Sequence, residues 1–225
     1  METFTLTREI PVEASYDVLV AGGGPAGTAA AICAARRGAK VLLVEATGCL
    51  GGMGTSGLVA SFGPMGDGTR TLVGGFTREL IETMHRRGFL APDVTPDFWT
   101  THYNRWIPFK PEELKRLLDE MTVAAGVTVR FFTHVVDADA KANKVVGAVV
   151  QNIEGFQYIR AKAFIDATGD AVLADLCGAP CLIAGQDWPD VQPGTVCSLY
   201  AGVNWDDPAY GSGIEGRDKI KMKAK

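Results

Sequence analysis

The chain has 225 residues, of which 47% are hydrophobic and 21% are charged, and its formal net charge is −4. This composition predicts a globular protein with a buried core and excludes a chain that is disordered by default. The acidic balance provides no basic field for a phosphate backbone, so we do not expect nucleic-acid binding. No run approaches the roughly 18 apolar residues of a membrane span, and the first residues lack the apolar region of a secretion signal.

The cysteines indicate the redox environment. There are five of them, an odd number, and they lack the paired C-x-x-C spacing of a zinc or iron–sulfur site. We therefore expect no bound metal. Unpaired thiols are typical of a reducing compartment, so we expect a cytoplasmic protein that has no membrane among its partners.

A strand, a glycine turn and a helix follow one another near the start of the chain. Residues 16–21 (YDVLVA) predict a strand that is buried on both faces. After the glycine turn, the alanine-rich run 28–37 has the composition of a helix, which Gly38 ends. Residues 40–45 predict a second buried strand with the acidic residue Glu45 at its end. These elements together predict a βαβ unit.

The glycine turn has the G-x-G-x-x-G spacing of a dinucleotide-binding site. Gly22 permits a tight turn, Gly24 lets a pyrophosphate approach the backbone, and Gly27 lets the helix pack on the strand. Glu45 is placed to accept hydrogen bonds from a ribose diol. The alternative is a purely structural turn, which the flanking strand, helix and acid disfavour. The unit alone does not distinguish NAD from FAD.

Residues 48–75 are rich in glycine, but apolar side chains such as Leu50, Met53 and Leu58 are interleaved with the glycines. Such a segment prefers burial over a flexible linker. We interpret it as backbone held close against a flat ligand, because glycine allows close approach without steric conflict. The alternative is a packed, turn-rich loop.

The next stretch contains a helix and an aromatic segment. Residues 75–88 predict an amphipathic helix on which His85 is solvated. Residues 90–109 are rich in proline and aromatic side chains, and we expect a loop whose aromatics contribute mainly to a core. His102 and Arg105 within it are candidates for binding an acidic substrate.

The second half predicts one helix and several strands. Residues 111–126 predict a helix that begins at Pro111 and ends at Gly126, and residues 127–133 predict a third strand. Polar turns at residues 140–144 and 152–155 then separate short apolar runs, which is typical of a three-stranded antiparallel meander.

A second strand-to-turn junction follows the meander. Residues 163–167 predict a further strand, which stops at the glycine turn Thr168-Gly169-Asp170 before a short helix that ends at Gly178. A turn at the carboxyl end of a strand lies where open α/β sheets bind ligands. Asp170 is also a candidate N-cap of the short helix.

Three segments in this order resemble a known family: DVLVAGGGPAGTAAAICAARRGAKVLLVE, GCLGGMGTSGLV and AKAFIDATGDAVLADLCGAP. Over about residues 14–205 the chain resembles FAD-dependent oxidoreductases of the glutathione-reductase-like superfamily. More narrowly, it resembles the bacterial group related to the flavin domain of heterodisulfide reductase. The first segment is shared with many dinucleotide binders, whereas ATGD after a β-meander is specific to the FAD type.

The resemblance implies an α/β fold in two parts. Residues 14–60 and 107–178 would form a Rossmann-like FAD-binding domain with a β-meander crossover. Residues 61–106 and 179–225 would form part of a second, substrate-side or cap domain that is incomplete at its C-terminus, because members of this group are about twice as long.

The resemblance also implies FAD as the cofactor and assigns residues to its parts. The pyrophosphate would be held by the first glycine turn and covered by the second, the adenosine ribose by the acid, the ribityl chain by the glycine-rich loop, and adenine by backbone at the corner before the meander. The turn that holds the pyrophosphate would comprise Gly22, Gly24, Pro25, Ala26 and Gly27, and the turn that covers it Thr168, Gly169 and Asp170. The acid that binds the ribose would be Glu45. The loop by the ribityl chain would contribute Gly51, Gly52 and Thr55, and the backbone by adenine would be that of Val135 or Val136.

The implied function is that of an FAD-dependent oxidoreductase, which transfers hydride or electrons to or from an unidentified small molecule. Cys49 is a candidate attachment point, redox thiol or proton donor, the alternative being a small buried residue. Two other functions stay open. One is an NAD-linked dehydrogenase, which the meander and ATGD disfavour, and the other is a non-catalytic dinucleotide-binding fragment. A redox partner or a homo-oligomer is also left open.

Overall fold

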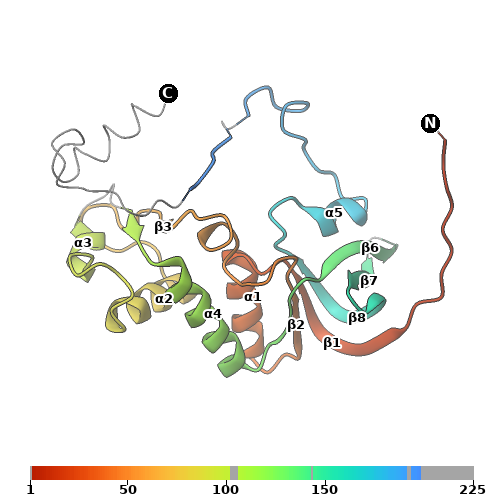
Figure 1. Ribbon diagram of the computed structural model, residues 1–225, viewed down its shortest axis with the longest axis horizontal. Helices are drawn as coiled ribbons and strands as arrows, with labels where there is room; N and C mark the ends of the chain where they lie inside the picture. Colours follow the sequence, from red (N-terminus) through yellow and green to blue (C-terminus); the bar gives the residue numbers. More distant parts are fainter. Residues whose placement is uncertain (1, 102–105, 143, 192–193, 199–225) are drawn as a thin grey trace. The chain divides into compact units, whose positions relative to one another are not determined.

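The computed structural model describes residues 2–101, 106–142, 144–191 and 194–198 (Figure 1). By its internal contacts the chain separates into residues 1–194 and residues 195–225, and the fold given below is that of the first part. The candidate substrate-binding residues His102 and Arg105 lie outside the described residues.

A six-stranded sheet has the strand order β5-β2-β1-β8-β7-β6. Strands β5, β2, β1 and β8 are mutually parallel, and β7 and β6 continue the sheet in antiparallel pairing. This arrangement confirms the predicted Rossmann-like fold with a β-meander. The strands are β1 (Val12–Ala21), β2 (Val41–Val44), β5 (Thr128–Arg130), β6 (His134–Lys141), β7 (Lys144–Asn152) and β8 (Gly155–Asp166).

The helices begin and end near residues that favour helix boundaries. Helix α4 (Pro111–Ala125) begins at the predicted proline and ends at Gly126, whose φ of 78° is the left-handed conformation of a helix C-cap. The first helix, α1, is Pro25–Ala35, which starts three residues before the predicted run. The remaining elements are the 3-10 turn η1 (Gly52–Gly54), α2 (Gly75–Arg86), α3 (Pro96–Thr101), α5 (Val172–Leu176) and the two-stranded sheet of β3 (Ser61–Phe62) and β4 (Ile107–Pro108).

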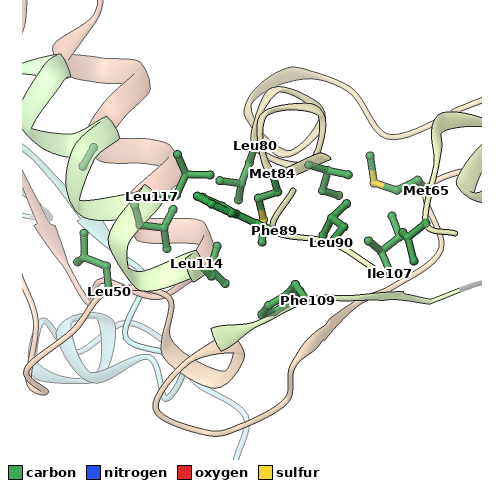
Figure 2. Close-up of a cluster of buried hydrophobic side chains, with 14 of the residues drawn as sticks. Leu50, Met65, Leu80, Met84, Phe89, Leu90, Ile107, Phe109, Leu114 and Leu117 are labelled. Atoms are coloured by element: carbon green, nitrogen blue, oxygen red, sulfur yellow. The ribbon is translucent and has the colours of Figure 1, made fainter. Parts of the chain in front are cut away.

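Two hydrophobic clusters cover the two faces of the parallel strands. Alternate residues of β1 divide between them, since Val20 belongs to the larger cluster and Leu19 to the smaller. The larger cluster joins the sheet to α1, α2 and α4, and Figure 2 shows Leu80 and Leu117 among its side chains. The smaller cluster joins β1 and β2 to the meander and to α5. The end of β1, from Leu19 to Ala21, and the whole of β2 are therefore buried on both faces, as their composition predicts.

The predicted loop over residues 90–109 is wrong, because the structure has α3 and β4 there. Strand β4 pairs with β3, a contact between segments far apart in sequence that no local pattern reveals. The aromatic Trp99 and Phe109 are buried, as expected of core residues. His85 is only partly exposed, because its ring packs edge-on against Trp99 at 5.7 Å.

Strand β8 is also longer than predicted. The last meander strand and the strand at residues 163–167 form one continuous element, because β1 pairs with β8 from Val12 to Ala21. Within the glycine-rich segment, Leu50 is buried, whereas Met53 and Leu58 are exposed. Residues of the predicted second domain, such as Met65 and Met84, share the larger cluster with the βαβ unit. The division into two domains stays a prediction.

Candidate functional site

Three turns meet at the carboxyl ends of adjacent parallel strands. Gly22–Gly24 follows β1, Glu45 follows β2, and Thr168–Gly169 follows β8, the other neighbour of β1. Backbone hydrogen bonds hold these ends together, since Gly22 N donates to Val44 O at 2.8 Å and Ala167 N donates to Ala21 O at 2.8 Å. The crevice outside such strand ends is the ligand-binding position of open α/β sheets.

The glycines of the first turn have different structural roles. Gly22 has a φ of 93°, and a Cβ there would lie 2.4 Å from Ala167 O. A Cβ at Gly27 would lie 1.8 Å from Gly22 O, so this position needs glycine for the helix to pack on the turn. A Cβ at Gly24 would meet no atom within 4 Å. Gly24 therefore has open space where a side chain would be.

The N-terminus of α1 points out of this turn without a cap. Its N-cap is Gly24, no described side chain caps it, and its first turn has no acidic residue. The backbone N–H groups of a helix's first turn lack partners inside the helix, and the helix dipole adds partial positive charge there. Pro25 and Ala26 at this end are exposed. Such an end is suited to an anion such as pyrophosphate.

Glu45 is buried, with 6% of its surface exposed, and its carboxylate is held from two sides. Its Oε2 accepts a hydrogen bond from Gly23 N at 2.6 Å. Its Oε1 accepts from both N and Oγ1 of Thr47, each at 2.7 Å. The carboxylate is thereby placed directly beside the first glycine turn, with a lone pair on Oε2 left for a further donor.

The second glycine pair packs directly on the first turn. Gly51 N donates to Gly23 O at 2.9 Å, and a Cβ at Gly52 would lie 3.0 Å from the Cα of Gly24. Both glycines have positive φ, 102° and 51°. The structure thus brings together the two glycine segments that the sequence analysis assigned to one cofactor. Thr55 is fully buried, and its hydroxyl donates to Leu50 O at 2.7 Å, so in this structure it holds the loop.

Cys49 lies in the same loop and is partly exposed. Its Sγ is 3.2 Å from Ser56 Oγ and 3.8 Å from Thr55 Oγ1. These contacts put the thiol among hydroxyl groups at the edge of the glycine-rich loop. Cys49 is accessible, as a reactive thiol must be.

The turn after β8 is organised by Asp166. Its Oδ1 accepts from N and Oγ1 of Thr168, at 2.9 and 2.8 Å, and its Oδ2 accepts from Ala174 N at 2.9 Å. Burial by itself raises the pKa of Asp166, but these donors outweigh it and hold the pKa below its usual value. The prediction that Asp170 caps α5 is wrong, because the N-cap is Ala171 and Thr168 Oγ1 accepts the bond from Val172 N. Asp170 and Gly169 are exposed.

The corner before the meander lies beside the end of β2. Thr133 N donates to Glu45 O at 2.9 Å, immediately before β6 begins. Val135 pairs with Val150 of β7, but the register shifts before Asp137, so Val136 lies in a bulge. A bulge on an edge strand leaves backbone groups free for other partners, which suits the predicted contact with adenine.

The residues present fit FAD. Gly24 leaves open space, the end of α1 is uncapped, and a carboxylate for a ribose lies next to both. Among the described residues, no group of three or more His, Cys, Asp or Glu is arranged to hold a metal ion. None of the described helices is both long and apolar enough to cross a membrane.

Several site residues escaped the sequence analysis. Thr47 holds the carboxylate of Glu45, and Asp166 holds the turn at Thr168–Gly169. Thr28 donates its hydroxyl to Gly23 O at 2.9 Å. Glu45-x-Thr47 and Asp166-x-Thr168 have the same spacing at the ends of two strands, a pattern that also occurs at Asp67-x-Thr69 away from the site. Hydrogen bonds from backbone N–H groups to a nearby acidic side chain are common in turns.

Comparison with protein families gives one match over most of the chain. The family described as FAD dependent oxidoreductase matches residues 17–223. This match confirms FAD as the predicted cofactor. The narrower link to heterodisulfide reductase is not tested by it.

Individual relatives are more distant. Digeranylgeranylglycerophospholipid reductase 2 of Methanopyrus kandleri is 27% identical over 162 residues, which are 68% of this chain and 37% of the relative. A geranylgeranyl bacteriochlorophyll reductase-like structure from Thermoplasma acidophilum superposes with a TM-score of 0.54 at 22% identity, covering 73% of this chain and 42% of that one. For THI4 of Thermovibrio ammonificans the TM-score is 0.51 at 21% identity, covering 72% and 61%. The match spans well under half of the length of the curated relative. The two solved structures are similar to this chain in fold.

Proposed function

Since the chain belongs to the FAD dependent oxidoreductase family, we propose that it binds FAD along the carboxyl edge of its parallel strands and transfers hydride or electrons to or from a small molecule. One observation carries this proposal above the others. The uncapped end of α1, the carboxylate of Glu45 and the second glycine pair converge on Gly23–Gly24. This is the set of groups that a dinucleotide needs at close range.

Each group has a role set by its chemistry. The N–H groups at the start of α1 hold the pyrophosphate, and Gly24 lets it approach. Glu45 accepts a hydrogen bond from the adenosine ribose, and backbone at Val135 or Val136 contacts adenine. Thr168, Gly169 and Asp170 close over the pyrophosphate from the β8 side. Gly51 and Gly52 lie along the ribityl chain, and the buried Thr55 holds their loop through its hydrogen bond to Leu50 O.

When bound, FAD supplies the hydride-transfer and one-electron chemistry, so the chain's own task is to position substrate and control access of water. Residues 61–106 and 179–225 form the substrate side in this proposal, and His102 and Arg105 bind an acidic substrate. Cys49, whose thiol lies at the edge of the glycine-rich loop, is the candidate for proton or thiol chemistry. The five free cysteines support a reducing, cytoplasmic environment.

We also propose the narrower relationship to the flavin domain of heterodisulfide reductase, within the glutathione-reductase-like superfamily. It is supported by the ATGD segment at the end of β8 together with the antiparallel meander that precedes it. Both features belong to the FAD type of Rossmann-like domain rather than to an NAD-linked dehydrogenase.

The first experiment is a visible absorption spectrum of the purified chain, followed by acid release and mass identification of any chromophore. We expect the bands of oxidised flavin and the release of intact FAD. A chromophore that resists acid release would assign covalent attachment, with Cys49→Ser as the variant that restores release. A colourless protein that does not take up FAD on reconstitution contradicts the proposal. Retained ADP binding would then favour a non-catalytic nucleotide-binding fragment, and NADH binding an NAD-linked dehydrogenase.

A further inference from the structure

Phe132 is a large apolar side chain that is exposed at the edge of the candidate site. Its surface is 68% exposed, whereas the preceding Phe131 packs against the larger hydrophobic cluster. Its backbone φ is 51°, a left-handed conformation that is unfavourable for bulky residues. Backbone strain of this kind lowers stability, and it persists mainly where function requires it.

Backbone hydrogen bonds fix where this residue lies. Phe132 N donates to Thr47 O at 3.1 Å, and Thr133 N donates to Glu45 O at 2.9 Å. The segment that contains Phe132 therefore runs alongside residues 45–47. Phe132 lies in the connection between β5 and β6, four residues before Val136 of the bulge.

The ring depends on a glycine beside it. A Cβ placed on Gly48 would lie 2.5 Å from Cζ of Phe132 and 3.2 Å from its Cε1. The contact is made by the far edge of the ring, and the ring's exposure leaves area for another flat group. The absence of a side chain at Gly48, three residues along the chain from Glu45, thus leaves room for the Phe132 ring.

We propose that Phe132 binds the adenine ring of FAD by stacking against it. This inference rests on the proposed function and adds a side chain that the sequence analysis did not assign. Adenine is joined directly to the ribose that Glu45 binds, so a base must lie within a short distance of this carboxylate. A flat purine and an aromatic side chain attract each other through their faces, in any sequence context.

The decisive variant is Phe132→Gly, because glycine adopts a φ of 51° without strain while the ring is removed. We expect its melting temperature in the absence of ligand to equal or exceed that of the wild type. We expect its affinity for FAD, and for ADP used as a probe of the adenosine half, to fall about tenfold. Phe132→Tyr keeps the ring and is expected to keep the affinity. Phe4→Gly removes another exposed phenylalanine, 89% exposed in the N-terminal segment, and is expected to change neither quantity.

Gly48→Ala provides an independent test. Its new methyl group displaces the ring, so it should weaken FAD binding in the wild type but not in the Phe132→Gly background. Unchanged FAD and ADP affinities in Phe132→Gly would overturn stacking while leaving FAD binding by this chain intact. Failure of the wild type itself to bind FAD or ADP would overturn the proposed function, and this inference with it.

Discussion

Thr47 gives both of its donors to one oxygen of Glu45, with N and Oγ1 each 2.7 Å from Oε1. The other carboxylate oxygen accepts Gly23 N at 2.6 Å, so the side chain of Glu45 is fixed between the end of β2 and the first glycine turn. Hydrogen bonds to an ionised acceptor are shorter and stronger than neutral ones. Thr47 therefore positions the group that is proposed to hold the adenosine ribose.

Thr47→Val should lower FAD affinity by about three- to tenfold, because it removes one of the hydrogen bonds that fix Glu45 and keeps the side chain's shape. Thr47→Ser should keep the affinity. Titration of the apoprotein with FAD, followed by flavin fluorescence, measures the effect. Thr69→Val is the matched control, because Thr69 makes the same paired contact with Asp67, at 3.0 and 2.7 Å, in a separate exposed loop. An equal loss of affinity in both variants would contradict the positioning role.

Substitutions at Gly24 and Gly27 should have different effects, one on FAD affinity and the other on the stability of the fold. Gly24→Val adds its side chain where no atom lies within 4 Å, so we expect a normal melting temperature and a loss of FAD affinity of more than about a hundredfold. Gly27→Ala places a Cβ 1.8 Å from Gly22 O, so we expect destabilisation of about 3 kcal/mol or more. Thermal unfolding and FAD titration of both variants provide the check. FAD binding by Gly24→Val with wild-type affinity would remove the first glycine turn from the proposed site.

The parts of the fold that the sequence predicts are those whose boundaries have local chemical causes. Helix α4 begins at a proline that lacks an N–H and ends at Gly126 with positive φ. The short strand β4 and the length of β8 could not be predicted in this way. Both depend on pairing with distant segments, β3 in one case and the full length of β1 in the other.

The same limit applies to the site. The glycines and Glu45 were predictable because a dinucleotide imposes their spacing. The residues that hold them in place are linked by contacts across turns, as Thr28 is to Gly23. An acid followed two residues later by threonine makes the same pair of hydrogen bonds at Glu45 and at Asp166, but it also does so at Asp67, outside the site, so this motif alone does not identify site residues.

Gly147 in the meander gives a test of stability apart from the site. A Cβ at Gly147 would lie 2.1 Å from Oη of Tyr158, whose hydroxyl donates to Asp139 at 2.8 Å. Gly147→Ala should therefore displace the tyrosine ring and lower the free energy of unfolding by about 1 to 3 kcal/mol. Combining it with Tyr158→Ala, which removes the ring, should make the added methyl group nearly neutral. A fully additive double variant, measured by urea unfolding, would contradict this explanation.

Asp166 predicts a specific dependence of stability on pH. Burial opposes ionisation of this carboxyl, but the N–H groups of Thr168 and Ala174 and the Thr168 hydroxyl hold its pKa below the ordinary value of 3.8. A folded-state pKa below the unfolded value stabilises the fold when the carboxylate is ionised in both states. This contribution is therefore fully present above about pH 4 and is lost as the pH falls through the folded-state pKa.

Asp166→Asn should lower the free energy of unfolding by about 1 to 3 kcal/mol at pH 7, because the amide has one acceptor and places N–H donors against backbone N–H groups. The difference from the wild type should shrink as the pH falls below about 4, since the wild-type carboxylate is then protonated. FAD affinity should fall as well, because Thr168 and the start of α5 lose their anchor. Urea unfolding of both proteins from pH 7 down to about pH 3 measures the first effect. A difference that stays constant over this range would show that the charge of Asp166 does not stabilise the turn.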